Sequence, residues 1–196
     1  MTEHKGLPIL RFADQAAWHA WLLEQGAVSA GVWLQLAKKG AARPCVGKPA
    51  AIETAIIHGW IDGQLDRFDA ESWLVRFTPR GPRSKWSENN RAAAETLLAA
   101  GRMLPNGLAQ IEKAKADGRW DAAYAPQSRA EIPADLQAAL DAEPAAKAFF
   151  ATLEGANRYA VLYRIHDARR PETRAARIGK FVDMLKRGEV LHPRKI

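Results

Sequence analysis

Alternating apolar and polar side chains predict a small β-sheet in the first half of the chain. Residues 31–39 alternate apolar residues with outward-facing ones, a pattern typical of a half-buried strand. Residues 60–68 and 72–78 form two more candidate strands, and Asp69 lies at the turn between them. In the first of these, the alternation places Trp60 on the same face as Asp62 and Gln64. We therefore expect a small antiparallel sheet.

Apolar residues at helical spacing predict helices around this sheet and throughout the second half of the chain. Capping residues and glycines limit four helices in the first part, at 14–26, 49–59, 87–101 and 105–118. Four short helices are expected later, at 135–141, 144–153, 155–167 and 172–187. This pattern indicates an α+β fold with a C-terminal helical unit. The expected domains are an α+β domain over 1–118, a linker over 119–132 and a helical domain over 133–196.

Charge changes this picture by pointing to anionic partners. The chain has 196 residues and a net charge of +7, and the whole excess lies in residues 158–196. Arg170, Arg174 and Arg177 lie near one face of the last predicted helix, where they could contact nucleic acid. The ordinary explanation of the same charges is a solvated helix face.

The segment RFTPRGPRSKWSENN, residues 76–90, predicts a site for an anionic ligand. It holds four cations before its first acid, its prolines restrict the backbone, and it leads into a helix N-terminus. Guanidinium groups bind phosphate or carboxylate in a two-pronged manner. Trp60 and Trp86 could add flat surfaces for a ring or a base. Alternatively, these cations pair with the acids of the preceding hairpin, which are Asp62, Asp66, Asp69 and Glu71.

Evidence for catalysis is weak, so an enzyme is less expected than a binding protein. Asp62 is a candidate general base, but no second catalytic group stands at a defined spacing. Cys45 is the only cysteine, and His58 and the other histidines show no metal-binding spacing. We therefore expect no cofactor and no metal. The N-terminus lacks an apolar run typical of a secretory signal and no stretch is long enough to span a membrane, which favours the cytoplasm.

Several segments resemble the YdeI/OmpD-associated proteins, also called bacteriocin-protection proteins. The resemblance rests on VWLQLAKK (32–39), GWIDGQ (59–64), RFTPRGPRSKWSENN (76–90), GRMLPNGLAQIEKAKADGRW (101–120) and ARRPETRAARI (168–178). It marks nine residues as a site without assigned chemistry, namely Trp60, Asp62, Gln64, Arg76, Arg80, Arg83, Ser84, Trp86 and Asn89. The charge of the loop adds Lys85. The chain departs from the family pattern at His58, where an aromatic residue is common.

The resemblance implies a role linked to an outer-membrane porin and to protection against bacteriocins or envelope stress. It implies no reaction and no cofactor. The expected function is therefore a non-enzymatic, stress-linked protein that binds an anionic small molecule or phosphate-containing ligand at the arginine-rich loop, with a protein partner also possible. Two alternatives stay open: nucleic-acid binding through the C-terminal arginines, and an uncharacterised enzyme centred on Asp62.

Overall fold

The computed structural model describes residues 2–43 and 45–192. The chain divides into two compact units, Met1–Ala123 and Tyr124–Ile196. Each unit has its own apolar core. The α+β class with a helical C-terminal part is confirmed. The predicted domain limits at 118 and 133 stay a prediction, because compactness alone does not establish which part folds independently.

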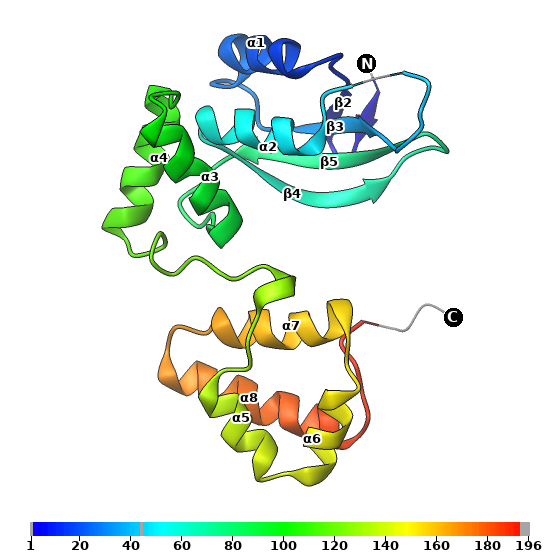
Figure 1. Ribbon diagram of the computed structural model, residues 1–196, viewed down its shortest axis with the longest axis vertical. Coiled ribbons are helices and arrows are strands. Elements are labelled where there is room, and N and C mark those ends of the chain that lie inside the picture. The colour runs from blue at the N-terminus through cyan, green and yellow to red at the C-terminus, as the bar shows by residue number, and fades with distance from the viewer. Residues whose placement is uncertain (1, 44, 193–196) are drawn as a thin grey trace. The chain divides into compact units, whose positions relative to one another are not determined.

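The first unit contains a five-stranded sheet with helices over one face (Figure 1). Its strands are β1 (Glu3–His4), β2 (Leu7–Leu10), β3 (Val32–Ala37), β4 (Trp60–Arg67) and β5 (Ser72–Pro79), in the order β1-β2-β3-β5-β4. Its helices are α1 (Gln15–Gln25), α2 (Lys48–Ile57), α3 (Glu88–Ala99) and α4 (Pro105–Ala116). The β3–β5–β4 pairing is antiparallel, but β2 runs parallel to β3, so the sheet is mixed rather than purely antiparallel.

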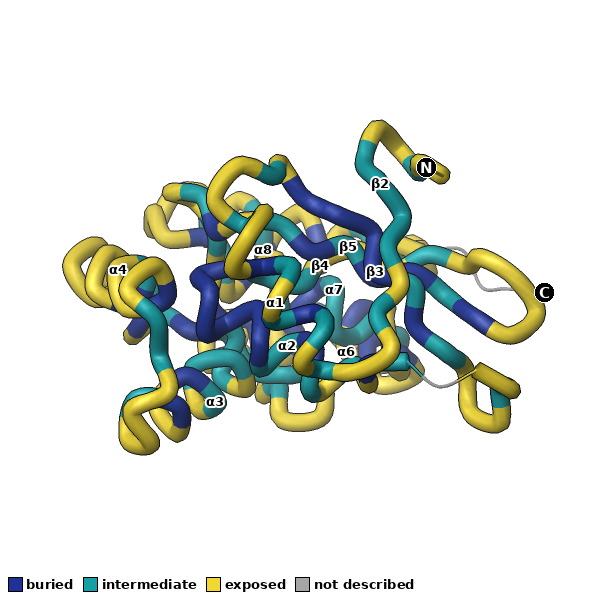
Figure 2. Tube along the Cα trace, turned by 90° about the horizontal axis from the view of Figure 1, so that it is seen from above, coloured by how far each residue is buried: buried dark blue, intermediate teal, exposed yellow. Residues whose placement is uncertain are grey.

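The apolar alternation of β3 and β5 builds the main core of this unit. Leu34 pairs with Val75 and Val32 with Phe77, and residues at opposed positions share one face of a sheet. Trp18 of α1 packs on that face and is fully buried. Figure 2 shows β3 and much of α2 as buried, whereas α4 is largely exposed. A second cluster, built on α2, α3 and α4, includes Trp86 and Trp120.

A register shift in β4 changes one predicted alignment. Trp60 and Asp62 pair with Pro79 and Phe77, but the register slips between Asp62 and Leu65. Such a bulge interrupts the alternation of side chains between the two faces. Gln64 lies within this irregular stretch, so the prediction that it continues the face of Trp60 and Asp62 was wrong.

The second unit is helical. It contains a short 3-10 helix (Gln127–Arg129), α5 (Ala134–Asp141), α6 (Pro144–Ala151), α7 (Gly155–His166) and α8 (Pro171–Lys186). The apolar stripe of α8, formed by Ile178, Phe181, Val182 and Leu185, lies in the core of this unit. That stripe follows the 3.6-residue period that predicted the helix.

Candidate functional site

Arg80, which follows β5, is buried inside the first unit. Only 5% of the residue is exposed, and its guanidinium carbon lies 3.5 Å from the centre of the Trp86 ring. Nη1 donates a hydrogen bond to the carbonyl of Lys85 at 3.1 Å, and the backbone N–H donates to Gly59 at 3.0 Å. A guanidinium stacks well on an aromatic face. Arg80 therefore orders the loop of residues 80–86.

Ser84 closes a tight turn in the same loop. Its hydroxyl accepts a hydrogen bond from the Gly81 N–H at 3.0 Å, and its own N–H donates to the Gly81 carbonyl at 3.0 Å. Pro82 occupies the second position of this turn, which proline favours. Arg119 donates to the Ser84 carbonyl at 2.7 Å from outside the loop. Arg83 follows Pro82 and is exposed.

The two tryptophans predicted as ligand platforms are core residues. Trp86 is 1% exposed, with Arg80 on its face and Trp120 against it at a ring separation of 4.8 Å. Trp60 is 2% exposed, and its Nε1 donates to the carbonyl of Gly26 at 3.2 Å. Neither ring presents a free face, so we no longer assign either of them to stacking on a ligand.

Asp62 has an amide partner rather than an arginine. Asn90 Nδ2 of α3 donates to Asp62 Oδ1 at 3.4 Å, and Asp62 is half-buried. None of the hollows identified within either unit has Asp62 in its lining. The geometry therefore adds no second catalytic group to Asp62, and the enzyme alternative stays a prediction.

Arg76 and Trp33 form a pair of unsatisfied donors on the sheet. They occupy directly opposed positions of β5 and β3 and share one face. Arg76 Nε and Trp33 Nε1 are both buried without a hydrogen-bond acceptor. Within residues 2–43 and 45–192, the side chain of Arg76 makes no hydrogen bond and no ion pair. A positive charge thus lies half-buried on this face without a counter-ion.

The N-terminal hairpin reaches the same face. His4 meets the Trp33 ring edge-on at 4.8 Å, and Lys5 Nζ lies 5.6 Å from its centre. Both side chains bond to Asp66 of β4, Lys5 at 2.8 Å and His4 at 2.9 Å. These hydrogen bonds hold the pKa of Asp66 well below its usual range. Asp66 is therefore already neutralised by groups other than Arg76.

The acids of the hairpin do not neutralise the predicted site. Asp69 accepts hydrogen bonds from the backbone N–H groups of Glu71 and Ser72 and closes the β4–β5 turn. Among the residues that the structure describes, neither Arg76 nor Arg83 pairs with a carboxylate. The alternative in which hairpin acids satisfy these two cations was therefore wrong.

The remaining predicted residues lie at the surface near the start of α3. Lys85 and Asn89 are exposed. Ser87 caps α3 by accepting the Asn90 N–H at 3.1 Å, and Glu88 adds an acid to the first turn. That acid already complements the positive end of the helix dipole, which weakens this helix end as an anion site.

In the second unit, most of the predicted nucleic-acid contacts have internal roles. Arg174 donates hydrogen bonds from Nε and Nη2 to the two carboxylate oxygens of Asp135. Its Nη1 donates to the Ile165 carbonyl at 2.9 Å. Arg177 donates to the carbonyl of Arg164. Arg170 is exposed at the start of α8, where it precedes Pro171. Nucleic-acid binding stays a prediction. It now depends mainly on Arg170 and on the net positive charge of residues 158–196.

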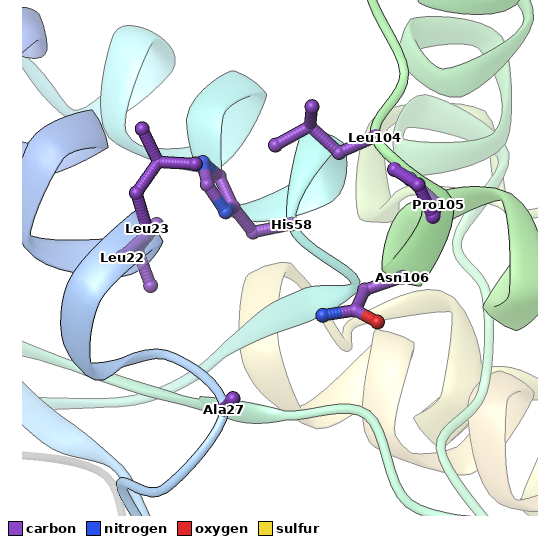
Figure 3. A pocket seen from close by; sticks show the side chains of 7 residues that line it. All are labelled: Leu22, Leu23, Ala27, His58, Leu104, Pro105 and Asn106. Carbon is purple, nitrogen blue, oxygen red and sulfur yellow. The ribbon is translucent and has the colours of Figure 1, made fainter.

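Sequence reasoning missed a histidine pair between α1 and the end of α2. His58 Nε2 and His19 Nδ1 are 3.1 Å apart, within hydrogen-bond distance. Burial and the nearby His19 lower the pKa of His58 from 6.5 to about 4. His58 also lines a hollow of about 270 Å³, shown in Figure 3. Its other lining residues are Leu22, Leu23, Ala27, Leu104, Pro105 and Asn106.

The described part of the chain offers neither a metal-binding cluster nor a membrane-spanning helix. The described part of the chain contains no cluster of three or more histidine, cysteine or acidic side chains that could hold a metal ion. None of the helices in that part is long and apolar enough to cross a membrane.

Each of the two units contains a segment that matches a known protein family. Residues 10–110 match the family described as "Domain of unknown function (DUF8412)". Residues 129–188 match the family described as "Bacteriocin-protection, YdeI or OmpD-Associated". The chain belongs to the first of these families, whose model covers more than half of its length. The resemblance to the second family, predicted from the motifs, is confirmed for residues 129–188. Of those motifs, ARRPETRAARI lies inside the second match, whereas GWIDGQ and RFTPRGPRSKWSENN lie inside the first. Neither the curated proteins nor the solved structures include a significant match.

Proposed function

We propose that the protein is a non-enzymatic binding protein that acts in bacteriocin protection or envelope stress, and that its first unit binds an anionic ligand at Arg76. The family description of residues 129–188 supports the biological role. The unsatisfied donors of Arg76 and its neighbour Trp33 support the proposal that the ligand is an anion. A cytoplasmic location and a protein partner remain part of this proposal, and cell fractionation tests the location.

The unpaired charge of Arg76 is the observation that carries the proposal. A half-buried guanidinium without a counter-ion is costly, because it has lost part of its hydration and gained no partner. The buried Trp33 Nε1 adds a second unsatisfied donor directly across the strand pair. One anionic oxygen ligand on this face could accept from both groups.

Phosphate and carboxylate are the ligand groups that fit these donors. Guanidinium binds both groups in a two-pronged manner, and charge-assisted hydrogen bonds are about twice as strong as neutral ones. Arg83 and Lys85 are exposed cations of the same segment, and they raise the local concentration of anions through long-range attraction. Arg80 has the separate role of ordering the loop that carries them.

Thermal unfolding with inorganic phosphate or sulfate tests the proposal. We expect the melting temperature of the wild-type protein to rise with anion concentration, because ligand that binds only the folded state stabilises it by about 2.7 kcal/mol at a hundred times Kd. Arg76→Met should abolish this response. The matched control is Arg67→Met, which removes an exposed cation from the neighbouring strand β4.

Two results would separate binding from general charge effects. Without anion, Arg76→Met should be at least as stable as the wild type, because methionine removes an uncompensated charge and keeps the apolar stem. If Arg76→Met and Arg67→Met both retain the full response to phosphate, Arg76 is not the ligand contact and the proposal fails.

A further inference from the structure

The hollow beside His58 has fixed walls. Gly59 has φ = +75°, a conformation that favours glycine, and a Cβ there would lie 2.8 Å from the carbonyl oxygen of Asn106. A Cβ on Gly107 would lie 2.4 Å from the carbonyl oxygen of Ile57. These two glycines let the start of α4 approach the end of α2 closely. Close backbone packing of α2 and α4 therefore fixes one side of the hollow.

Its lining is apolar except at one end. Leu22 and Leu23 of α1 face Leu104 and Pro105 across the hollow, as Figure 3 shows. Leu23 is 59% exposed, so part of its apolar surface is open to a ligand. An apolar ligand would remove this surface from water.

His58 supplies a polar group within this apolar lining. The residue is 7% exposed, and its Nε2 bonds to His19. Its second ring nitrogen, Nδ1, has no partner among the residues that the structure describes. Asn106 places a side-chain amide beside the same hollow. Nδ1 is not among the fully buried atoms that lack a partner, so a ligand in the hollow can reach it, and such a nitrogen beside a cavity is a candidate ligand contact.

The start of α4 adds donors at the same end. Its N-cap residue is Leu104, which provides no side-chain hydrogen bond to the first turn. The first N–H groups of a helix have no intrahelical acceptor and attract negative charge. Pro105 has no N–H, and the Leu104 N–H donates to the Ile57 carbonyl at 3.3 Å. In α4 these groups are therefore the N–H groups of Asn106 and Gly107. Because Pro105 and Asn106 line the hollow, this helix end lies beside His58.

We propose that this hollow binds a small monocarboxylate with an apolar body, which packs against the leucines while its carboxylate meets His58 Nδ1, the Asn106 amide and the start of α4. A volume of about 270 Å³ suits about nine non-hydrogen atoms, by comparison with about 30 Å³ per water molecule. This proposal is independent of the anion site at Arg76.

Binding would fix the hydrogen bonds of the histidine pair. A carboxylate only accepts, so His58 Nδ1 must carry the proton that it donates. His58 Nε2 then accepts from His19 Nδ1–H, and His19 Nε2 is left to accept from solvent. His19 lines a second hollow, of about 500 Å³, together with Gln15 and Arg102. In addition, the bound negative charge would raise the pKa of His58 from its low value in the free protein.

Titration with sodium octanoate, followed by NMR of the histidine ring nitrogens, tests this proposal. We expect octanoate to shift both ring nitrogens of His58 toward the Nδ1–H tautomer. Octanol shares the chain without the charge, and acetate shares the charge without the chain. Each should bind at least about tenfold more weakly, since about 1.4 kcal/mol corresponds to a factor of ten. Inorganic phosphate, the probe for Arg76, should leave His58 unchanged.

Variants of exposed leucines provide matched controls. Leu23→Glu places a negative charge in the wall and should weaken octanoate binding at least tenfold, whereas Leu65→Glu, at a leucine 57% exposed on β4, should not. His58→Phe should reduce octanoate binding to the level of octanol. The proposal is overturned if octanoate leaves the His58 nitrogens unshifted, or if Leu23→Glu binds octanoate as tightly as Leu65→Glu does.

Discussion

The guanidinium carbon of Arg80 lies 3.5 Å from the centre of the Trp86 ring, and this contact organises the loop between β5 and α3. The stacked pair lies in the interior, with 5% of Arg80 and 1% of Trp86 exposed. Arg80, a central cation of the segment 76–90, therefore stabilises the fold and is not free to bind a ligand. Two neighbours in the same segment, Arg76 and Arg83, have no acidic partner within the described residues.

Arg80→Ala should destabilise the first unit. The substitution removes a stacked guanidinium, worth about 2 kcal/mol when desolvated, and a hydrogen bond to the Lys85 carbonyl worth about 1 kcal/mol. We expect the free energy of unfolding to fall by about 3 kcal/mol in chemical denaturation. Arg83→Ala, at an exposed position of the same loop, should change it by less than about 0.5 kcal/mol. Equal effects of the two substitutions would contradict the structural role of Arg80.

Acid should loosen the N-terminal hairpin through Asp66. The pKa of Asp66 is lowered in the folded state by hydrogen bonds from Lys5 and His4, so its contribution to stability is present above the ordinary value near 3.8. That contribution is lost as pH falls below this value toward the lowered pKa. His4 and Lys5 contact the Trp33 ring, so the NMR signal of the Trp33 indole N–H should shift when the hairpin loosens.

Lys5→Ala should weaken this acid response, because the first-named hydrogen bond to Asp66 is then missing. Lys39→Ala removes a cation from an exposed position between β3 and α2 and serves as the control. An unchanged acid response of the Trp33 signal in Lys5→Ala would show that another group controls the hairpin.

His58 should make the first unit less stable at mildly acidic pH. Burial and His19 lower the pKa of His58 to about 4 in the folded state, against 6.5 for the free side chain. The unfolded chain therefore binds the proton more readily, and stability falls as pH decreases from 6.5 toward 4. Glu53, on the same helix as the residues before His58, is paired with Arg102 at 2.8 Å.

His58→Phe should flatten the stability profile between these two pH values, because no proton is taken up at that position on unfolding. Chemical denaturation at about pH 7 and about pH 5 measures the difference. A profile that keeps its full slope in His58→Phe would assign the acid sensitivity to other groups.

Nucleic-acid binding by the second unit would depend on Arg170 rather than Arg174. Arg174 holds Asp135 and the Ile165 carbonyl, so Arg174→Ala should lower stability in thermal unfolding. Arg170→Ala should leave stability unchanged because the residue is exposed. If the unit binds nucleic acid, Arg170→Ala should weaken binding and reduce its salt dependence by about one counter-ion. Affinity for oligonucleotides that is independent of salt would exclude the alternative.

Long periodic segments made most of the fold predictable. The helices from α1 to α8 and the strands β3, β4 and β5 follow apolar periodicity and cap residues. The strands β1 and β2 were missed because they have two and four residues, too few for a measurable alternation, and Pro8 interrupts the second. The bulge beside Gln64 has no strong local signal, so the face of that residue could not be predicted.

The candidate site was predictable in position but not in the role of each residue. Arg76, Arg80 and Arg83 share one segment, yet burial separates them into an unsatisfied charge, a stacked core group and an exposed cation. The loop also depends on Arg119, whose contact with Ser84 spans 35 positions. The partner of His58 is His19, 39 positions away. Such tertiary contacts leave no periodic signal in one sequence.

The most direct test of the anion site is NMR of the Arg76 Nε–H and Trp33 Nε1–H groups during titration with inorganic phosphate. We predict that both signals shift together with a single dissociation constant, because the two donors share one face and each lacks an acceptor. Arg76→Met should remove the shift at Trp33, whereas Arg67→Met should not. If phosphate moves neither signal, or if the Trp33 shift persists in Arg76→Met, the account of Arg76 as the ligand contact is wrong.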